Sequence, residues 1–156
     1  MLEDTENPMS SCASAAGGSI NGKITFGALA QQVLSLDAAI DWVALEEAGR
    51  VPSWAWRDPH TGSMRAGTTA NSAQLVDPLL LMIAESSDGL YGGETAANPH
   101  RLLFVVLAYG DFAQIVARLG RDAHVSVAVS PGINANVLGR KLTTLLDRCA
   151  QEPVVH

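Results

Sequence analysis

The sequence predicts an α+β domain in which a central antiparallel five-stranded sheet is packed against helices. The last third of the chain holds three short apolar runs separated by turn signals, RLLFVVLAYG, DFAQIVARLG and HVSVAVSPG, followed by an amphipathic helix. Two more apolar runs, AIDWVALEE and VPSWAWRD, are joined by a tight turn. Consecutive strands joined by short turns favour an antiparallel sheet with helices on it. The 156 residues, 47% hydrophobic and 17% charged, suit one soluble globular domain.

Three segments are expected along the chain. Residues 1–22 are rich in Ser, Ala, Gly and Asn and poor in large apolar side chains. Such a segment cannot bury enough surface to offset its ordering entropy, so a disordered N-terminal arm is expected. The domain itself is expected over residues 24–150, followed by a short tail over residues 151–156.

A short amphipathic helix is predicted between Thr25 and Asp37, with Thr25 as its N-cap. The apolar residues on its inner face recur at spacings of four and three: Leu29, Val33 and Leu36.

The next two runs are predicted to form a hairpin that turns at Gly49. AIDWVALEE has apolar residues on both faces, as in a mostly buried strand. In VPSWAWRD, Pro52 either starts the strand or places it at an edge, because proline lacks the N–H of a ladder hydrogen bond. Trp54 and Trp56 fall on one face of this strand. They are either an exposed partner-binding site or part of a wide core face under a helix.

A central helix is predicted from Asn71 to about Ser87, between two loops, DPHTGSMRAGTTAN and SSDGLYGGETAANPH. Pro78 would either kink this helix or delay its start. The second loop is long and glycine-rich, and such loops are often functional. The apolar face of the helix consists of Leu75, Leu79, Met82 and Ile83.

The three later strands differ in their patterns. DFAQIVARLG and HVSVAVS alternate, with Gln114 and Arg118 opposite the apolar face in the first and Ser126 and Ala128 in the second. Each is expected to have one solvated face. RLLFVVLAY is apolar on both faces, so something must cover its second face. The predicted element order is α-β-β-α-β-β-β-α.

The final helix is predicted from about Asn134, with an apolar stripe that ends at Cys149. Its place on the stripe favours a buried, inert thiol over a reactive one beside Arg148. Cys12 and Cys149 are not expected to form a disulfide framework, and a reduced cytoplasmic location is expected.

Composition excludes several classes of function. A net charge of −6, a pI near 5.0 and scattered basic residues argue against nucleic-acid binding. No apolar stretch reaches the roughly 18 residues that span a membrane. The acidic N-terminus lacks the features of a signal peptide.

No segment carries a recognisable set of catalytic or metal-binding groups, so no enzyme activity, cofactor or metal is predicted. GGSINGKIT has the spacing of a P-loop, but Ile24 stands where Ser or Thr should hold magnesium. The four histidines are scattered, and none has a metal-ligand spacing. His60 and His100 lie in predicted loops, within possible reach of Asp58 or Glu94, and are expected to be surface groups.

The strand and helix opening in AHVSVAVSPGINANVLGRKL resemble the roadblock (dynein light chain) domain family. The family pattern is an apolar strand, a short turn, and then an Asn and a small residue that open the last helix. Here the turn is Pro131 with Gly132, and the helix opens with Asn134, Asn136 and Gly139. The hairpin IDWVALEEAGRVPSWAW is similar to the family's first hairpin. The bacterial members include partners of small Ras-like GTPases.

The resemblance implies a non-enzymatic domain of roadblock/profilin-like fold that dimerises through its third strand and central helix. The homodimer would act as a platform for a Ras-like GTPase. The residues expected at the dimer interface are Leu102, Phe104, Val106, Leu75, Leu79 and Met82. A profilin-like or PAS-like sensor with a small molecule between sheet and helices is the alternative. An enzyme is a more distant third.

Overall fold

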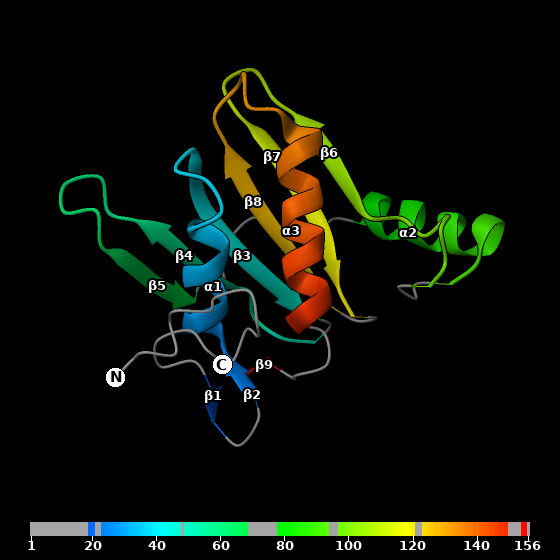
Figure 1. Ribbon diagram of the computed structural model, residues 1–156, viewed down its shortest axis with the longest axis horizontal. Coiled ribbons are helices and arrows are strands. Elements are labelled where there is room, and N and C mark those ends of the chain that lie inside the picture. Colours follow the sequence, from blue (N-terminus) through cyan, green and yellow to red (C-terminus); the bar gives the residue numbers. More distant parts are fainter. Residues whose placement is uncertain are drawn as a thin grey trace.

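The structure is a computed structural model. It describes residues 19–20, 23–47, 49–68, 78–93, 97–120, 123–149 and 154–155. Its centre is a six-stranded antiparallel sheet in the order β5-β4-β3-β8-β7-β6 (Figure 1). The strands are β3 (Ile40–Glu47), β4 (Ser53–Arg57), β5 (Met64–Thr68), β6 (Phe104–Ala108), β7 (Ala113–Leu119) and β8 (Ala123–Val129). The helices are α1 (Phe26–Leu34), α2 (Pro78–Tyr91) and α3 (Ala135–Cys149).

The predicted α+β class with an antiparallel sheet is confirmed, but the sheet has six strands rather than five. The additional strand is β5, which lies in a stretch predicted to be loop and pairs with β4. Its residues 64–67 are exposed at the sheet edge, so MRAGT carries no apolar alternation that would have indicated a strand. Strand β4 lies between β5 and β3, so it is an interior strand. It begins directly after Pro52, as the first of the two predicted possibilities for this proline requires.

A second, small sheet joins the two ends of the described chain. It has the order β1-β2-β9 and consists of β1 (Ser19–Ile20), β2 (Lys23–Thr25) and β9 (Val154–Val155). β1 lies within the predicted arm, and β9 lies within the predicted tail. Ile24 in β2 is fully buried.

Thr25 caps helix α1 as predicted. Its hydroxyl oxygen accepts a hydrogen bond from the Ala28 N–H at 3.1 Å. The helix is held at its other end by Arg57 of β4. The Arg57 guanidinium donates to the carbonyls of Ala38 at 3.1 Å and Ile40 at 2.9 Å, and also to that of Leu34. Arg57 thus supplies donors to carbonyls at the end of α1, in the following turn and at the start of β3.

Helix α3 begins where the sequence predicts. The Asn134 side-chain oxygen accepts from the Val137 N–H at 3.1 Å. The predicted apolar stripe faces the sheet and is buried, and Cys149 ends it with no exposed area. Cys149 is disulfide-bonded, so the prediction of a free thiol is wrong. A single sequence does not show which cysteines meet in the fold. Cys12 lies outside the described residues.

The main core lies between α1, α3 and one face of the sheet (Figure 1). We call this side the first face. Alternate strand residues point into it, because side chains of a strand alternate between the two faces. The fully buried residues that the strands of this sheet contribute are Ile40, Val43, Leu45, Ala55, Ile115, Ala117, Val125, Val127 and Val129.

Helix α2 differs from its predicted bounds. It is described from Pro78, a position at which a helix readily accommodates proline, and it continues through Asp88 and Gly89 to Tyr91. The sequence predicts a loop at residues 88–91, because Asp and Gly are weak helix formers. Residues 71–77 of the predicted helix lie outside the described part. α2 lies beyond β6 and apart from α1 and α3 (Figure 1).

Among the described residues, none of the helices combines the length and apolar character that a membrane crossing requires.

The hydrogen bonds of Arg57 predict that removal of this side chain lowers the stability of the fold more than removal of an ordinary surface arginine does. Replacing Arg57 with Met keeps the apolar stem and leaves the three carbonyls without their donor. We expect a loss of about 2 kcal/mol in the free energy of unfolding, measured with urea. Arg50→Met is the matched control, since Arg50 is exposed and 3.8 Å from Glu47, and it should cost less than about 0.5 kcal/mol. Equal effects of the two changes would contradict the capping role of Arg57.

Candidate functional site

The sheet has a second face, opposite α1 and α3, and two rows of paired residues cross it. The first row runs over five neighbouring strands through Trp54, Ala44, Ser126, Val116 and Val105. This face carries the partner-binding tryptophans that the sequence singled out.

The second row lies beside the first and runs in the same direction. It passes through Trp56, Trp42, Ala128, Gln114 and Leu107. Small residues occupy central strands in both rows, with Ala44 and Ser126 in the first and Ala128 in the second. Trp42 is the exception, because it places a large ring on the central strand β3.

The prediction that this face of β7 and β8 is solvated is wrong. Ser126 is 1% exposed, Ala128 is 2% exposed and Gln114 is 5% exposed. In the sequence, polar and small residues alternate with large apolar ones, which is the pattern of a strand with one solvated face. In the structure these polar and small residues are buried. Ser126 Oγ and Trp54 Nε1 are both buried, with no hydrogen-bond partner in the described structure.

The tryptophans form a cluster on this face. The ring centroids of Trp42 and Trp54 lie 5.1 Å apart at an interplanar angle of 56°. Trp54 is half-buried, and Trp56 is 38% exposed. Neither α1 nor α3 covers the tryptophans, because those helices pack on the first face. Partner binding by Trp54 and Trp56 remains a prediction.

At one end of the second face, charged residues gather around His124. Its paired neighbours are Glu46 on β3 and Arg118 on β7. Arg118 forms a bidentate ion pair with Asp88 of α2, with N–O distances of 3.1 and 3.0 Å. Burial, and then the positive charge of Arg118, lower the pKa of His124. The neutral imidazole is thus favoured beside the ion pair.

A small hollow separates α2 from this end of the sheet. It is lined by Ala84, Leu102, Leu103, Phe104, Val105, Val116, Arg118 and His124. The lining is apolar except for Arg118 and His124. The hollow therefore marks the site at which α2 rests against the second face.

The predicted dimer residues are divided between core and surface. Phe104 packs against α3, where a Cβ built on Gly139 would lie 2.6 Å from its ring. Leu102 lines the hollow beside α2. Val106 is 40% exposed on the edge strand, and Met82 is 60% exposed on α2. Leu79 belongs to α2, while Leu75 lies outside the described residues.

Further exposed apolar residues lie on the same two elements and in the turn after β6. We call the set the edge patch: Met82, Ile83, Leu90 and Tyr91 of α2, Val106 of β6 and Tyr109 of the following turn. Exposed apolar residues on an edge strand and a neighbouring helix make this set a candidate surface for protein–protein contact.

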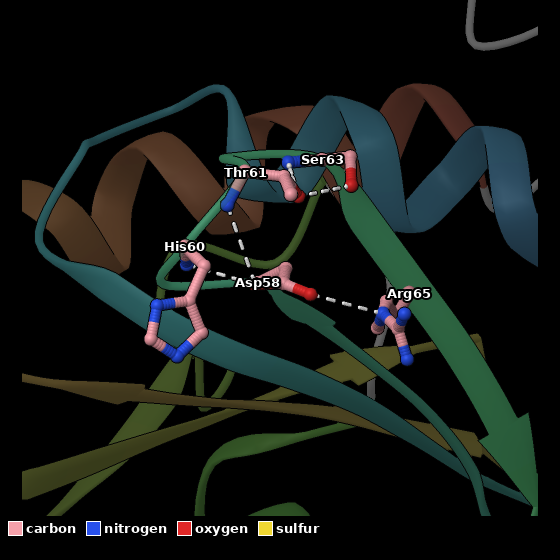
Figure 2. Close-up of polar contacts among 5 residues, drawn as sticks. All are labelled: Asp58, His60, Thr61, Ser63 and Arg65. Carbon is pink, nitrogen blue, oxygen red and sulfur yellow. Dashed lines mark hydrogen bonds and ion pairs between the residues drawn. The ribbon is translucent and has the colours of Figure 1, made fainter.

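Among the described residues, the contacts of the loop histidines are structural, and Glu94 lies outside the described part of the chain. In the β4–β5 turn the backbone N–H of His60, rather than its imidazole, donates to the Asp58 carboxylate at 2.8 Å (Figure 2). The other Asp58 oxygen is 3.1 Å from Arg65. These contacts close the hairpin turn. His100 is exposed and lies beside Tyr91, with ring centroids 6.2 Å apart.

In the described part of the chain, no group of three or more His, Cys, Asp or Glu residues could hold a metal ion. The partial P-loop match does not gain support either, because Ile24 is a fully buried core residue. Its glycines, Gly17 and Gly22, lie outside the described residues.

The contacts among Asp88, Arg118 and His124 were missed from the sequence. Alternation placed Arg118 correctly on the face away from the core. No sequence signal brings Asp88 to it, since the two residues are 30 positions apart and Asp88 was expected in a loop.

Comparisons with known proteins found similarity among solved structures. No protein-family model matches the chain, and no curated protein matches it. Among solved structures, the chain is similar to a Roadblock/LC7 domain from Streptomyces avermitilis, with a TM-score of 0.46, 13% identity, and coverage of 79% of this chain and 92% of that one. The matched structures include a roadblock domain.

Two further solved structures are similar at the same level. The gliding protein MglB from Thermus thermophilus has a TM-score of 0.41 and 15% identity, with 79% of this chain and 86% of that chain covered. MglC from Myxococcus xanthus has a TM-score of 0.41 and 13% identity, with 81% and 98% covered. Likeness this distant says nothing about the partners or activity of this chain.

The contact between Gly139 and Phe104 predicts that alanine is unfavourable at a helical position where it usually stabilises. Gly139→Ala gains about 1 kcal/mol of helix propensity, but overpacking against the ring costs about 1–3 kcal/mol. We expect a net loss of stability in urea unfolding, partly recovered by adding Phe104→Leu. Gly27→Ala in α1, where the nearest atom to the new Cβ is 4.0 Å away, is the control and should stabilise. A stabilised Gly139→Ala would show that Phe104 moves freely.

The lowered pKa of His124 predicts a pH dependence of stability. The unfolded chain takes up a proton as the pH falls through the ordinary value of 6.5, whereas the folded chain resists protonation. Stability should therefore be highest above pH 6.5 and fall below it, until the folded-state pKa is passed. Urea unfolding from about pH 8 to about pH 5 should show a smaller decline for His124→Gln than for the wild type. The exposed His60, changed to Gln, is the control, and identical profiles for all three proteins would contradict the prediction.

Proposed function

We propose that this protein is a non-enzymatic, roadblock-like scaffold that forms a homodimer and binds a Ras-like small GTPase. The proposal makes the edge patch the homodimer surface. Leu102, Phe104, Val106, Leu75, Leu79 and Met82 are the interface residues implied by the resemblance. Of the described ones, Val106 and Met82 are the most exposed.

One observation carries the dimer proposal: β6 is an edge strand with exposed apolar residues. Among the described strands it has a neighbour on one side only, β7. An exposed, apolar edge is a template for pairing with another strand. Val106 and Tyr109, at 40% and 49% exposure, would be covered if two β6 strands paired about a twofold axis.

The proposal that the partner is a Ras-like GTPase rests on the family resemblance. The second face, with Trp54 and Trp56, is the proposed GTPase-binding surface, because tryptophan is enriched at the energetic centres of interfaces. The cytoplasmic location is part of the same proposal. The disulfide-bonded Cys149 counts against it, since disulfides are rare in the reducing cytosol.

The sensor alternative requires a ligand pocket between the sheet and the helices. The hollow described between the sheet and α2 is small, and its lining is apolar except for Arg118 and His124. A ligand that co-purifies with the protein, or that raises its thermal stability, would favour the sensor over the scaffold.

The dimer proposal predicts that a charge on the β6 edge weakens self-association. Sedimentation equilibrium of the full chain should give a dimer at micromolar concentration. Val106→Glu should raise the dissociation constant at least about tenfold, because a carboxylate would be buried at the new strand pair. Val137→Glu is the matched control, since Val137 is a similarly exposed valine, at 48%, on α3. A wild-type monomer at tens of micromolar would overturn the proposal.

The partner is tested by a pull-down with the tagged full chain from native lysate, in GTPγS and in GDP, followed by mass spectrometry. Recovery of a Ras-like GTPase preferentially in one nucleotide state would support the regulator. The Trp56→Ala variant should lose most of that recovery while keeping the dimer, because Trp56 is the exposed member of the tryptophan cluster. Recovery of the chain alone in both states would leave the dimer and remove the GTPase from the proposal.

A further inference from the structure

The geometry points to the Asp88–Arg118 ion pair as a latch that holds α2 against the second face and so sets the position of the edge patch. Asp88 and Arg118 are positioning residues, which act through the helix rather than by touching a partner. The inference deepens the proposed function and rests on it for its role in dimerisation, because four of the six residues of the edge patch belong to α2. Its structural part does not depend on any partner.

The geometry of the ion pair suits this role. Both terminal nitrogens of Arg118 meet both oxygens of Asp88, at 3.1 and 3.0 Å. The Arg118 side chain is 12% exposed, and that of Asp88 is 34% exposed. A bidentate, charge-assisted contact with one partly buried partner is stronger and more directional than an exposed ion pair.

Among the α2 side chains that the structure describes, few others lie against the sheet. Among the α2 side chains described, from Met82 to Tyr91, Ala84 is the buried one, at 7% exposure. Ala84 and Asp88 are four positions apart and lie on one side of the helix. Burial of one alanine removes little apolar surface from water. The ion pair is therefore the principal described contact between α2 and the second face.

Asp88 also lies in the segment of α2 that has the lowest intrinsic helix propensity. The sequence ESSDGLY places Ser86, Ser87, Asp88 and Gly89 in succession, and all are poor helix formers. A 14-residue helix is marginal in water without tertiary contacts. Release of Asp88 should therefore both detach α2 and fray its C-terminal half.

The end of the helix is secured separately. Gly92 adopts a φ of +101°, and the Asn98 side-chain amide donates to the carbonyls of Tyr91 at 3.1 Å and Gly93 at 2.9 Å. This clasp joins α2 to the following loop but not to the sheet. It fixes where the helix ends, while Asp88 fixes where the helix lies.

The test is hydrogen–deuterium exchange of the full chain, compared among Asp88→Asn, Arg118→Gln and the swapped pair Asp88→Arg with Arg118→Asp. Amides of residues 80–91 should exchange roughly five- to tenfold faster in each single variant, while β3 and β8 remain protected. The swapped pair should restore at least part of the protection. Glu85→Gln, which removes an exposed carboxylate from the same helix, is the matched control and should leave exchange unchanged.

Self-association measured on the same variants separates the latch from the proposed function. If the edge patch is the dimer surface, the single variants should also raise the dimer dissociation constant, and the swapped pair should lower it again. Faster exchange in the single variants of a chain that proves monomeric would support the latch and overturn the dimer. Unchanged α2 exchange in both Asp88→Asn and Arg118→Gln would overturn the latch, whether or not the dimer is intact.

Discussion

The fold depends on the pairing of β3 with β8 at the centre of the sheet. This ladder joins residues 40–47 to residues 123–129 and unites the β3-β4-β5 meander with the β6-β7-β8 meander. Both strands are buried on their two faces: Val43 and Val127 face the helices, and Ala44 and Ser126 face the other side. A slip of one residue would exchange these faces, so burial on both sides specifies the register strongly.

The second face is the part of this structure that distinguishes it from a sheet with one solvated side. Its central strands carry the small residues Ala44, Ser126 and Ala128. The tryptophans lie on β3 and β4, and α2 lies against the end of β6 and β7. The unpartnered Trp54 Nε1 and Ser126 Oγ lie in one row of this face. Buried polar atoms without a hydrogen-bond partner are costly, so each of them lowers the stability of the fold relative to a satisfied group.

Most of the architecture could be predicted because local patterns determine it. The alternation in DFAQIVARLG and HVSVAVS fixed which residues face the core, and Thr25 and Asn134 cap their helices as expected. Strand β5 could not be predicted, because an exposed edge strand needs no apolar pattern. The extension of α2 through Asp88 and Gly89 was missed for a related reason, since contacts outside the helix compensate for weak local propensity.

The sequence by itself determined the fold class, the order of the main elements and the inward faces of the strands, because hydrophobic periodicity acts over a few residues. Tertiary structure alone decided what covers each face. It placed Phe104 against Gly139, brought Asp88 to Arg118, buried Ser126 and put Cys149 in a disulfide. The first two of these contacts join side chains that are 30 or more positions apart in the chain. Such meetings follow from the folding of the whole sheet and leave no periodic signal in the sequence.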